Sequence, residues 1–159
     1  MIKFGCAIIP SMKSILSPNS RNFKSFGKII DYPNLPKRGT KRNLWRIVHR
    51  EPAKTGWRIA YLVLRDKTIG QMAAHPTSDE TFEPIKGRAV LFVSKDKDLN
   101  NIKCFKLDKP LIVRKGIWHN VLTLDVETHI KICENANITQ KVWKLNFRFK
   151  SIEELGKRV

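Results

Sequence analysis

Two short stretches carry the residue types that could do chemistry in this chain of 159 residues. The first places His75 five residues before Glu80, with Gly87 seven residues further on. The second places His119 at the head of an apolar run, behind the turn residue Gly116. Two imidazoles and one carboxylate delivered by two strand edges predict a three-ligand site for a divalent metal, with open coordination positions. Without a metal, the same groups could perform acid–base chemistry.

The elements that must position these residues have the pattern of short β-strands. Runs rich in β-branched and aromatic residues alternate with turn signals, and no long helical period lies between them. Residues 76–86, which include Glu80, are expected to form a loop. About ten strands predict one all-β sandwich or barrel, and a jelly roll suits that number. The expected strands cover residues 28–31, 45–50, 57–65, 68–75, 88–94, 102–107, 110–113, 118–124, 128–133 and 140–149.

The chain is expected to form one domain over residues 21–159. Residues 1–20 show no clear periodicity and end in the turn-rich Ser-Pro-Asn-Ser, so we interpret them as an extension outside the main fold. A helical turn is expected over residues 22–27, closed by Gly27. A second is expected at residues 151–155, where Ser151 caps the turn.

The chain is strongly basic, with 31 Lys and Arg against 14 Asp and Glu and a net charge of +17. Residues 1–60 carry 13 basic and 2 acidic side chains, a net +11, and residues 61–159 carry 18 and 12, a net +6. Such a balance favours anionic partners, and we expect a small anionic substrate. No helix-turn-helix pattern, paired-Cys zinc spacing or aromatic RNA-binding signature is present, so nucleic acid is the less favoured of the partners that the charge allows.

The number and spacing of the cysteines indicate the redox state of the cellular compartment. Cys6, Cys104 and Cys133 are irregularly spaced and include no Cys-x-x-Cys pair. An odd number without a pattern argues against a disulfide framework and favours a reducing, cytoplasmic location. No apolar run approaches the roughly 18 residues that a membrane span needs, so no membrane partner is expected.

The motif residues resemble those of cupins. His75, Glu80 and Gly87 match His-x4-Glu-x6-Gly, the second half of the first cupin motif, and His119 lies where the second motif carries its His. The similarity covers roughly residues 23–148, and its most specific piece is Gly-x-Trp-His. More narrowly, the chain resembles the ureidoglycolate lyase family of cupins at Phe23–Asp31, at His75-Pro76 with Phe82 and Pro84, and at Gly116-Ile117-Trp118-His119.

This resemblance implies a fold and an activity. The fold would be an all-β, cupin-type double-stranded β-helix (a jelly-roll barrel) with short helical turns near the termini, and we expect a homodimer. The activity would be that of a carbon–nitrogen lyase of purine (allantoin) catabolism, which cleaves ureidoglycolate into glyoxylate and urea. A base removes the hydroxyl proton as the C–N bond breaks, while a cation or metal holds the carboxylate and the developing carbonyl.

The resemblance also suggests roles for particular residues. His119 or Glu80 would be the base, and His75 would be a ligand or orienting group. His75, Glu80 and His119 would together bind a divalent metal, with Zn, Mn, Fe and Ni all compatible. The candidates for binding a substrate carboxylate are Arg58, Arg114 and Lys115, with arginine favoured for its bidentate geometry.

Some positions depart from the cupin pattern. Ala73 stands where most metal cupins have their first His, and Thr123 stands where the second motif ends in Asn. Ureidoglycolate lyases favour an acidic residue shortly before the His-Pro pair and a Gln at or near Glu80, whereas Ala73 and Ala74 precede His75 here. These departures leave two alternatives open. One is a non-catalytic cupin that binds a small organic or sugar acid, and the other is a basic adaptor for nucleic acid.

Overall fold

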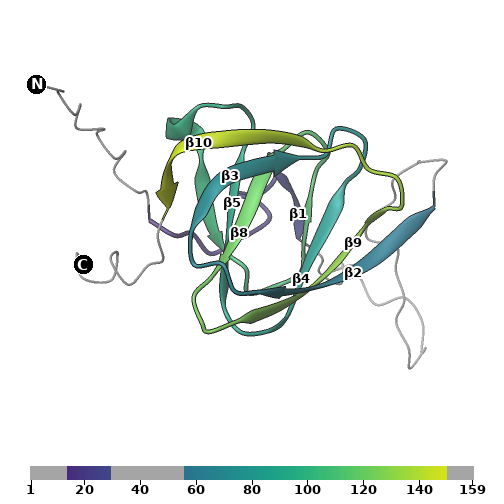
Figure 1. Ribbon diagram of the computed structural model, residues 1–159, viewed down its shortest axis with the longest axis horizontal. Helices are drawn as coiled ribbons and strands as arrows, with labels where there is room; N and C mark the ends of the chain where they lie inside the picture. Colours follow the sequence, from purple (N-terminus) through teal and green to yellow (C-terminus); the bar gives the residue numbers. More distant parts are fainter. Residues whose placement is uncertain (1–13, 30–55, 150–159) are drawn as a thin grey trace, which may run out of the picture.

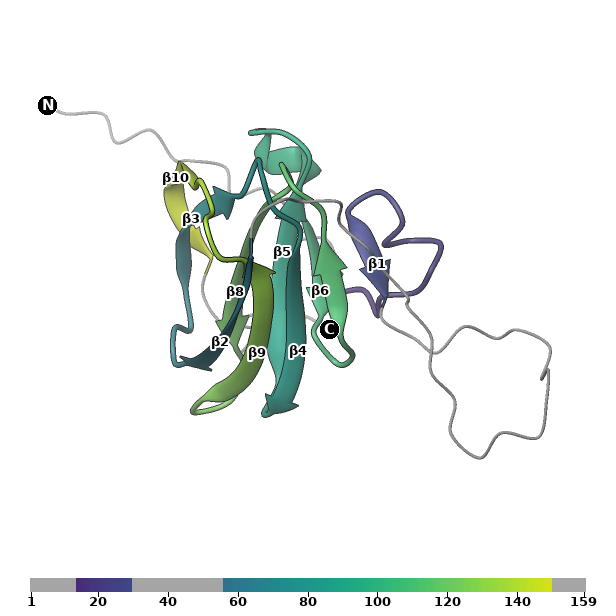
Figure 2. The ribbon, with the colours of Figure 1, turned by 90° about the vertical axis from the view of Figure 1, so that its right-hand side faces the viewer.

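The computed structural model describes residues 14–29 and 56–149, and these form two antiparallel β-sheets of five strands each. One sheet has the order β1-β7-β4-β9-β2 and the other the order β10-β3-β8-β5-β6. Figures 1 and 2 show the ribbon in two views. A short 3-10 helix, η1 (Leu99–Asn101), lies between β5 and β6. The strands are β1 (Gly27–Ile29), β2 (Trp57–Leu64), β3 (Ile69–Ala74), β4 (Glu80–Lys86), β5 (Ala89–Ser94), β6 (Lys103–Lys106), β7 (Leu111–Val113), β8 (Trp118–Thr123), β9 (Thr128–Asn135) and β10 (Lys141–Phe149).

Strands that are far apart in the chain pair with one another in a nested order. β5 pairs with β6, β4 with β7, β3 with β8, and β2 with β9, so that each pair encloses the previous one in the sequence. Apart from the β5–β6 hairpin, successive strands from β2 to β10 alternate between the two sheets. A long hairpin wound in this way is a jelly roll, the architecture of cupins. The predicted all-β, cupin-type double-stranded β-helix is therefore confirmed.

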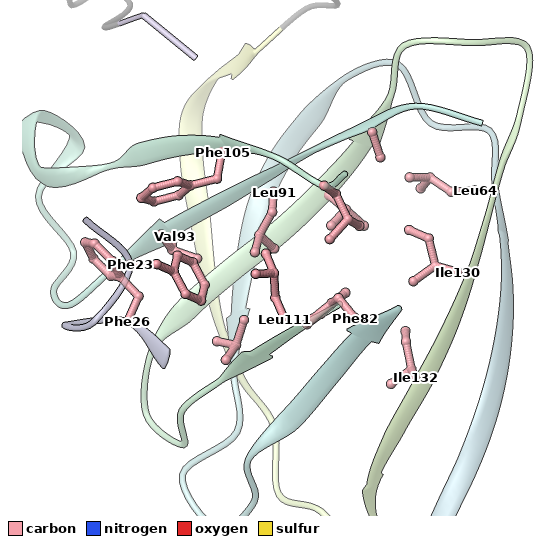
Figure 3. Packing of buried hydrophobic residues seen from close by; sticks show 14 residues of the cluster. Phe23, Phe26, Leu64, Phe82, Leu91, Val93, Phe105, Leu111, Ile130 and Ile132 are labelled. Atoms are coloured by element: carbon pink, nitrogen blue, oxygen red, sulfur yellow. The ribbon is translucent and has the colours of Figure 1, made fainter. Parts of the chain in front are cut away.

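The hydrophobic core lies between the facing sides of the two sheets. Phe105, Leu91 and Val93 come from one sheet and meet Phe82 and Leu111 from the other (Figure 3). All five are almost completely buried. Burial of this kind of apolar surface is the main driving force that holds the two layers together.

The outward side of the second sheet carries another apolar cluster. Val90 and Phe92 of β5 point to this side, while Leu91 and Val93 point into the barrel, as the alternation of a strand requires. Trp118 also belongs to this cluster, where its ring meets that of Trp143 at a centroid distance of 6.1 Å. Its neighbour on β8, His119, is thereby directed into the barrel.

The first described segment of the chain packs into the barrel. Leu16 forms a bridge with Phe105 through two backbone hydrogen bonds, donating to the carbonyl of Cys104 at 3.0 Å and accepting from the N–H of Lys106 at 2.9 Å. The fully buried Phe23 packs edge-on against Phe105, with ring centroids 5.0 Å apart. The expected helical turn over residues 22–27 is present and closes with a hydrogen bond from the Gly27 N–H to the Phe23 carbonyl. The chain thus joins the barrel before residue 20.

The expected strands within the described residues agree closely with the observed ones. The expected loop over residues 76–86 is wrong in its second half, because β4 begins at Glu80 and pairs with both β7 and β9. Pro84 of this strand lies at the irregular register between Pro84 and Lys86, where a strand tolerates a residue without an N–H. The expected strand at 45–50 and the expected turn at 151–155 lie outside the described residues.

No helix in the described part of the chain is long and apolar enough to cross a membrane.

Candidate metal centre

Three predicted ligand residues come together from both sheets at one end of the barrel. His75 directly follows β3, Glu80 begins β4, and His119 is the second residue of β8. β3 and β8 belong to one sheet and β4 to the other, so the three side chains meet across the barrel interior. All three are buried, with exposed fractions of 6% for each histidine and 7% for Glu80.

Two hydrogen bonds donated by backbone N–H groups join the loops that carry these residues. The N–H of Gly116 donates to the carbonyl of His75 at 2.9 Å, and the N–H of Lys115 donates to Oδ1 of Asp79 at 2.9 Å. Gly116 has a φ of 80°, a left-handed conformation that favours glycine. The turn before His119 therefore holds the start of β8 against the loop that follows β3.

The ligand atoms converge on one carboxylate oxygen. Nε2 of His119 lies 2.9 Å, and Nε2 of His75 lies 3.3 Å, from Oε2 of Glu80. Oε2 has no hydrogen-bond partner among the described residues. Buried polar atoms are nearly always hydrogen-bonded. Three ligand atoms within 4.8 Å of one another, one of them a buried oxygen without a hydrogen-bond partner among the described residues, fit a divalent cation held between them.

The ring of His119 is oriented by its neighbours. Nδ1 lies 2.9 Å from the backbone oxygen of Ile117, which can only accept a hydrogen bond, so Nδ1 carries a proton. Phe82 packs edge-on against the ring with centroids 5.5 Å apart. Nε2 then directs a lone pair at the carboxylate of Glu80 unless a second proton or a cation lies between them. Metal-binding histidines are commonly held in this way, through the ring nitrogen that does not bind the metal.

The groups of the centre shift one another's protonation. Contact with Glu80 raises the pKa of His75 against the opposing effect of burial, and the negative charges of Glu80 and Glu134 contribute to the rise. Burial alone would raise the pKa of Glu80, but its contacts with His119 and His75 outweigh this effect and lower the pKa to about 2. Glu80 is therefore an anion at neutral pH in the metal-free protein, and it is a weak base.

Ala73 faces the same centre. It lies directly opposite His119 in the β3–β8 pair and two residues before His75, and both relations place side chains on one face of a sheet. The position at which metal cupins carry a further His is thus inside the site, occupied by a methyl group. The protein ligands that remain are two imidazoles and one carboxylate, a set that suits Zn, Mn, Fe(II) or Ni.

The predicted substrate-binding residues lie in different surroundings. Arg58 is on β2, opposite Glu134 of β9 and beside the centre. Arg114 is exposed, and its Nη1 donates a hydrogen bond to the carbonyl of Lys24 at 3.0 Å. This contact of the guanidinium lies outside the centre. Lys115 is exposed at the turn before His119, where its backbone N–H bonds to the site loop.

Sequence reasoning missed Glu134, the last inward-facing residue of β9. Its exposed fraction is 7%, and its Oε1 accepts hydrogen bonds from Nε and Nη2 of Arg58 at 2.9 and 2.7 Å. A signal was present in the sequence. Thr128, Ile130, Ile132 and Glu134 alternate along β9, so a row of inward residues ends in a carboxylate. A charge at the end of a buried row has to be paired or functional, because burying it alone is costly.

Two other features lie apart from the centre. His129 contacts the hydroxyl of Tyr61 at 2.7 Å and Oε1 of Glu127 at 2.9 Å, both outside the centre. A surface hollow lies at the other end of β3 and is lined by Asp66, Thr68, Gly70, Gln71, Lys144, Leu145 and Asn146.

Comparison with known proteins gives distant likenesses in structure only. No family model matches the chain, and no curated protein matches it. A variant of Bacillus subtilis oxalate decarboxylase is 16% identical, with a TM-score of 0.43, over 58% of this chain and 24% of that one. The TDP-quinovose 3,4-ketoisomerase of Campylobacter jejuni is 12% identical, with a TM-score of 0.43, over 64% and 75%. A 3,4-ketoisomerase of Helicobacter canadensis is 14% identical, with a TM-score of 0.43, over 63% and 72%.

This chain therefore spans about a quarter of the oxalate decarboxylase chain. At such identities and scores, the likenesses carry no argument about the reaction. The fold assignment rests on the strand pairing, and the interpretation of the site rests on its own geometry.

Proposed function

We propose that the chain is a metal-dependent cupin enzyme that acts on a small acid and, in the most specific form of the proposal, a carbon–nitrogen lyase of the ureidoglycolate lyase type. The observation that carries the proposal is the buried centre of His75, Glu80 and His119, whose ligand atoms lie within 4.8 Å of one another. The substrate class comes from the resemblance in sequence, above all from Gly-x-Trp-His at residues 116–119.

His75, Glu80 and His119 would hold the metal through two Nε2 atoms and a carboxylate oxygen. A divalent ion bound there would supply Lewis acidity toward the carboxylate and developing carbonyl of the substrate. The lowered pKa of Glu80 favours the role of anionic ligand over that of base. His119 directs its Nε2 at the same point and could accept the substrate hydroxyl proton only when no ion is bound to that atom.

A second candidate is a non-catalytic cupin that binds a small organic or sugar acid. The observation in its favour is Ala73, which removes one ligand from the inner face of the site. Arg58 would serve such a protein equally well as a carboxylate anchor. The two candidates differ in turnover and share the requirement for an acid ligand.

The test combines metal content with turnover. Purified protein is loaded with Zn, Mn, Fe(II) or Ni, dialysed, and measured for bound metal and for glyoxylate released from ureidoglycolate. We expect about one equivalent of one of these metals, and glyoxylate release that is lost in Glu80→Gln. His129→Ala is the matched control, because it removes an imidazole with polar partners outside the centre. Metal uptake and acid binding without turnover would favour the second candidate, and absence of both would contradict the proposed site.

The homodimer and the preference for a small anion over nucleic acid stay predictions. Sedimentation gives the oligomeric state.

If the charge of +17 only solvates the surface, nucleic-acid binding will be weak and will vanish with added salt. Sequence-preferring binding at physiological salt would favour the adaptor alternative.

A further inference from the structure

Glu134 is a buried carboxylate with one oxygen in use and one open. Oε1 accepts two hydrogen bonds from Arg58, whereas Oε2 is buried and has no hydrogen-bond partner among the described residues. Both donors of Arg58 thus act on the same oxygen. Leaving a buried acceptor without a donor costs free energy, and more so when it is charged, so an oxygen of this kind indicates a donor from outside the described residues, as a bound ligand would supply.

The β-register places this oxygen beside the metal centre. Glu134 lies opposite Arg58 in the β2–β9 pair and opposite Glu80 in the β4–β9 pair. Residues directly opposite share a face, so Arg58, Glu134 and Glu80 form a row across one sheet at the end of the barrel that carries His75 and His119. Glu134 is close enough for its charge to act on His75.

Glu134 is nevertheless not one of the converging ligands. The three groups whose ligand atoms lie within 4.8 Å of one another are His75, Glu80 and His119. Glu134 is also fixed by Arg58, whose side chain is 48% exposed while that of Glu134 is 5% exposed. A carboxylate held beside the centre by a cation at the rim is positioned to contact a molecule bound at the centre, not the ion itself.

We propose that Oε2 of Glu134 accepts a hydrogen bond from an N–H or O–H donor at the end remote from the carboxylate of the small acid bound at the His75–Glu80–His119 centre, with Arg58 as the positioning residue. This inference rests on the proposed function, and it narrows the ligand to an acid that carries a donor at that remote end. The terminal amide of a ureido acid meets that requirement. An acid of the same length that ends in a methyl group leaves Oε2 without a partner.

Two probes that differ in one group test the inference. N-carbamoylglycine ends in NH2, and N-acetylglycine ends in CH3 at the same position. By calorimetry on the metal-loaded protein, we expect N-carbamoylglycine to bind at least about tenfold more tightly, because the methyl analogue leaves a buried charged acceptor unpaired. Glu134→Gln should lose most of this preference, since it keeps the shape and removes the charge. Arg58→Lys should weaken it partially, because a point charge replaces a planar fork.

Metal content and a melting curve of each variant distinguish the possible failures. Glu134→Gln should retain the metal and melt near the wild-type temperature. If it loses the metal, Glu134 is a ligand and the inference is wrong, while the proposed function stands. Equal binding of the two probes, or a preference unchanged in Glu134→Gln, also overturns the inference alone. If the wild-type protein binds neither metal nor either probe, both the inference and the proposed function are wrong.

Discussion

The two ends of the barrel bury polar side chains in opposite states of hydrogen bonding. At the end away from the metal centre, Thr123 and Thr128 are completely buried, and their hydroxyls lie 2.7 Å apart. Thr128 donates to the carbonyl of Arg88 at 2.7 Å, and Thr123 accepts from the N–H of Asp125 at 3.1 Å. Every hydroxyl in this cluster has a protein partner, so the cluster needs nothing from outside the chain.

The end that carries His75, Glu80 and Glu134 differs. The three buried side-chain atoms without a hydrogen-bond partner among the described residues are His75 Nδ1, Glu80 Oε2 and Glu134 Oε2, and all three lie at this end. The same strands, β4, β8 and β9, contribute to both ends. The difference teaches that burial of polar groups alone does not mark a functional site. Buried polar groups without a partner among the described residues are the better indication.

The largest expected effect is on metal binding, and its absence would contradict the difference drawn between the two ends of the barrel. His75→Ala, Glu80→Gln and His119→Ala should each lower metal or acid-ligand affinity by at least about a hundredfold, because two ligands do not hold a divalent ion as three do. Thermal unfolding measured near pH 7.5 without metal should stay close to wild type, because these side chains contribute to the site and not to the packed apolar core. For each variant, calorimetry gives the ligand affinity and a melting curve gives the thermal stability. Variants that bind normally, or that only melt early, would make these residues structural.

The second prediction concerns the satisfied end. Gly87 has a φ of 81°, and an added Cβ would lie 2.6 Å from the backbone oxygen of Glu127. Gly87→Ala should therefore destabilise the fold by about 2–4 kcal/mol, as strain and clash add. Thr128→Val should cost about 1–3 kcal/mol, because it leaves the Arg88 carbonyl and Thr123 hydroxyl without this partner. Denaturant unfolding gives the cost. Metal affinity of the folded fraction should be unchanged, and a parallel loss would show that the two ends are coupled.

The third prediction is the pH dependence of the metal-free protein. The pKa of Glu80 is lowered from 4.5 to about 2, so its contribution to stability is present above pH 4.5 and is lost as the pH falls toward 2. The pKa of His75 is raised above 6.5, so its contribution is present below pH 6.5 and is lost as the pH rises through the folded-state value. With a chelator present, the stability of wild type relative to Glu80→Gln should be greatest between about pH 4.5 and 6.5. A constant difference in melting temperature from pH 3 to 8 would contradict this.

The smallest expected effect separates the two positive-φ glycines. Gly116 has a φ of 80°, but an added Cβ would meet no atom within 4 Å. Gly116→Ala should therefore cost only the backbone strain, about 1 kcal/mol, less than Gly87→Ala. Because this turn orients β8, we expect a measurable loss of metal affinity alongside the small loss of stability. If Gly116→Ala were less stable than Gly87→Ala, the conclusion that only Gly87 is crowded by neighbouring atoms would be wrong.

The predictions from sequence succeeded where the signal was local. Short runs of β-branched, aromatic and other apolar residues between turn signals predicted the strands from β5 to β10, and the motif residues His75, Glu80 and His119 predicted the three groups that meet. The loop expected around Glu80 was wrong because β4 is held by pairing with β7 and β9, which no local pattern shows.

Glu134 shows why the rest could not be predicted. Its place beside Glu80 depends on the register between β4 and β9, and its hold on Arg58 depends on the register between β9 and β2. Register is set by packing of whole faces, and no short sequence pattern contains it. The alternation along β9 could have flagged a buried carboxylate, but not its neighbours.

The nested pairing of strands also dictates when the metal centre can form during folding. The β5–β6 hairpin closes a short loop, whereas β3 must pair with β8, and β2 with β9, which lie much further along the chain. Contacts of such long range make folding slow, in the range of milliseconds to seconds for all-β proteins of this kind. His75, Glu80 and His119 meet only after these outer pairs have formed. Metal should consequently slow unfolding and leave the rate of folding nearly unchanged, since it binds a centre that is absent from the early folding nucleus.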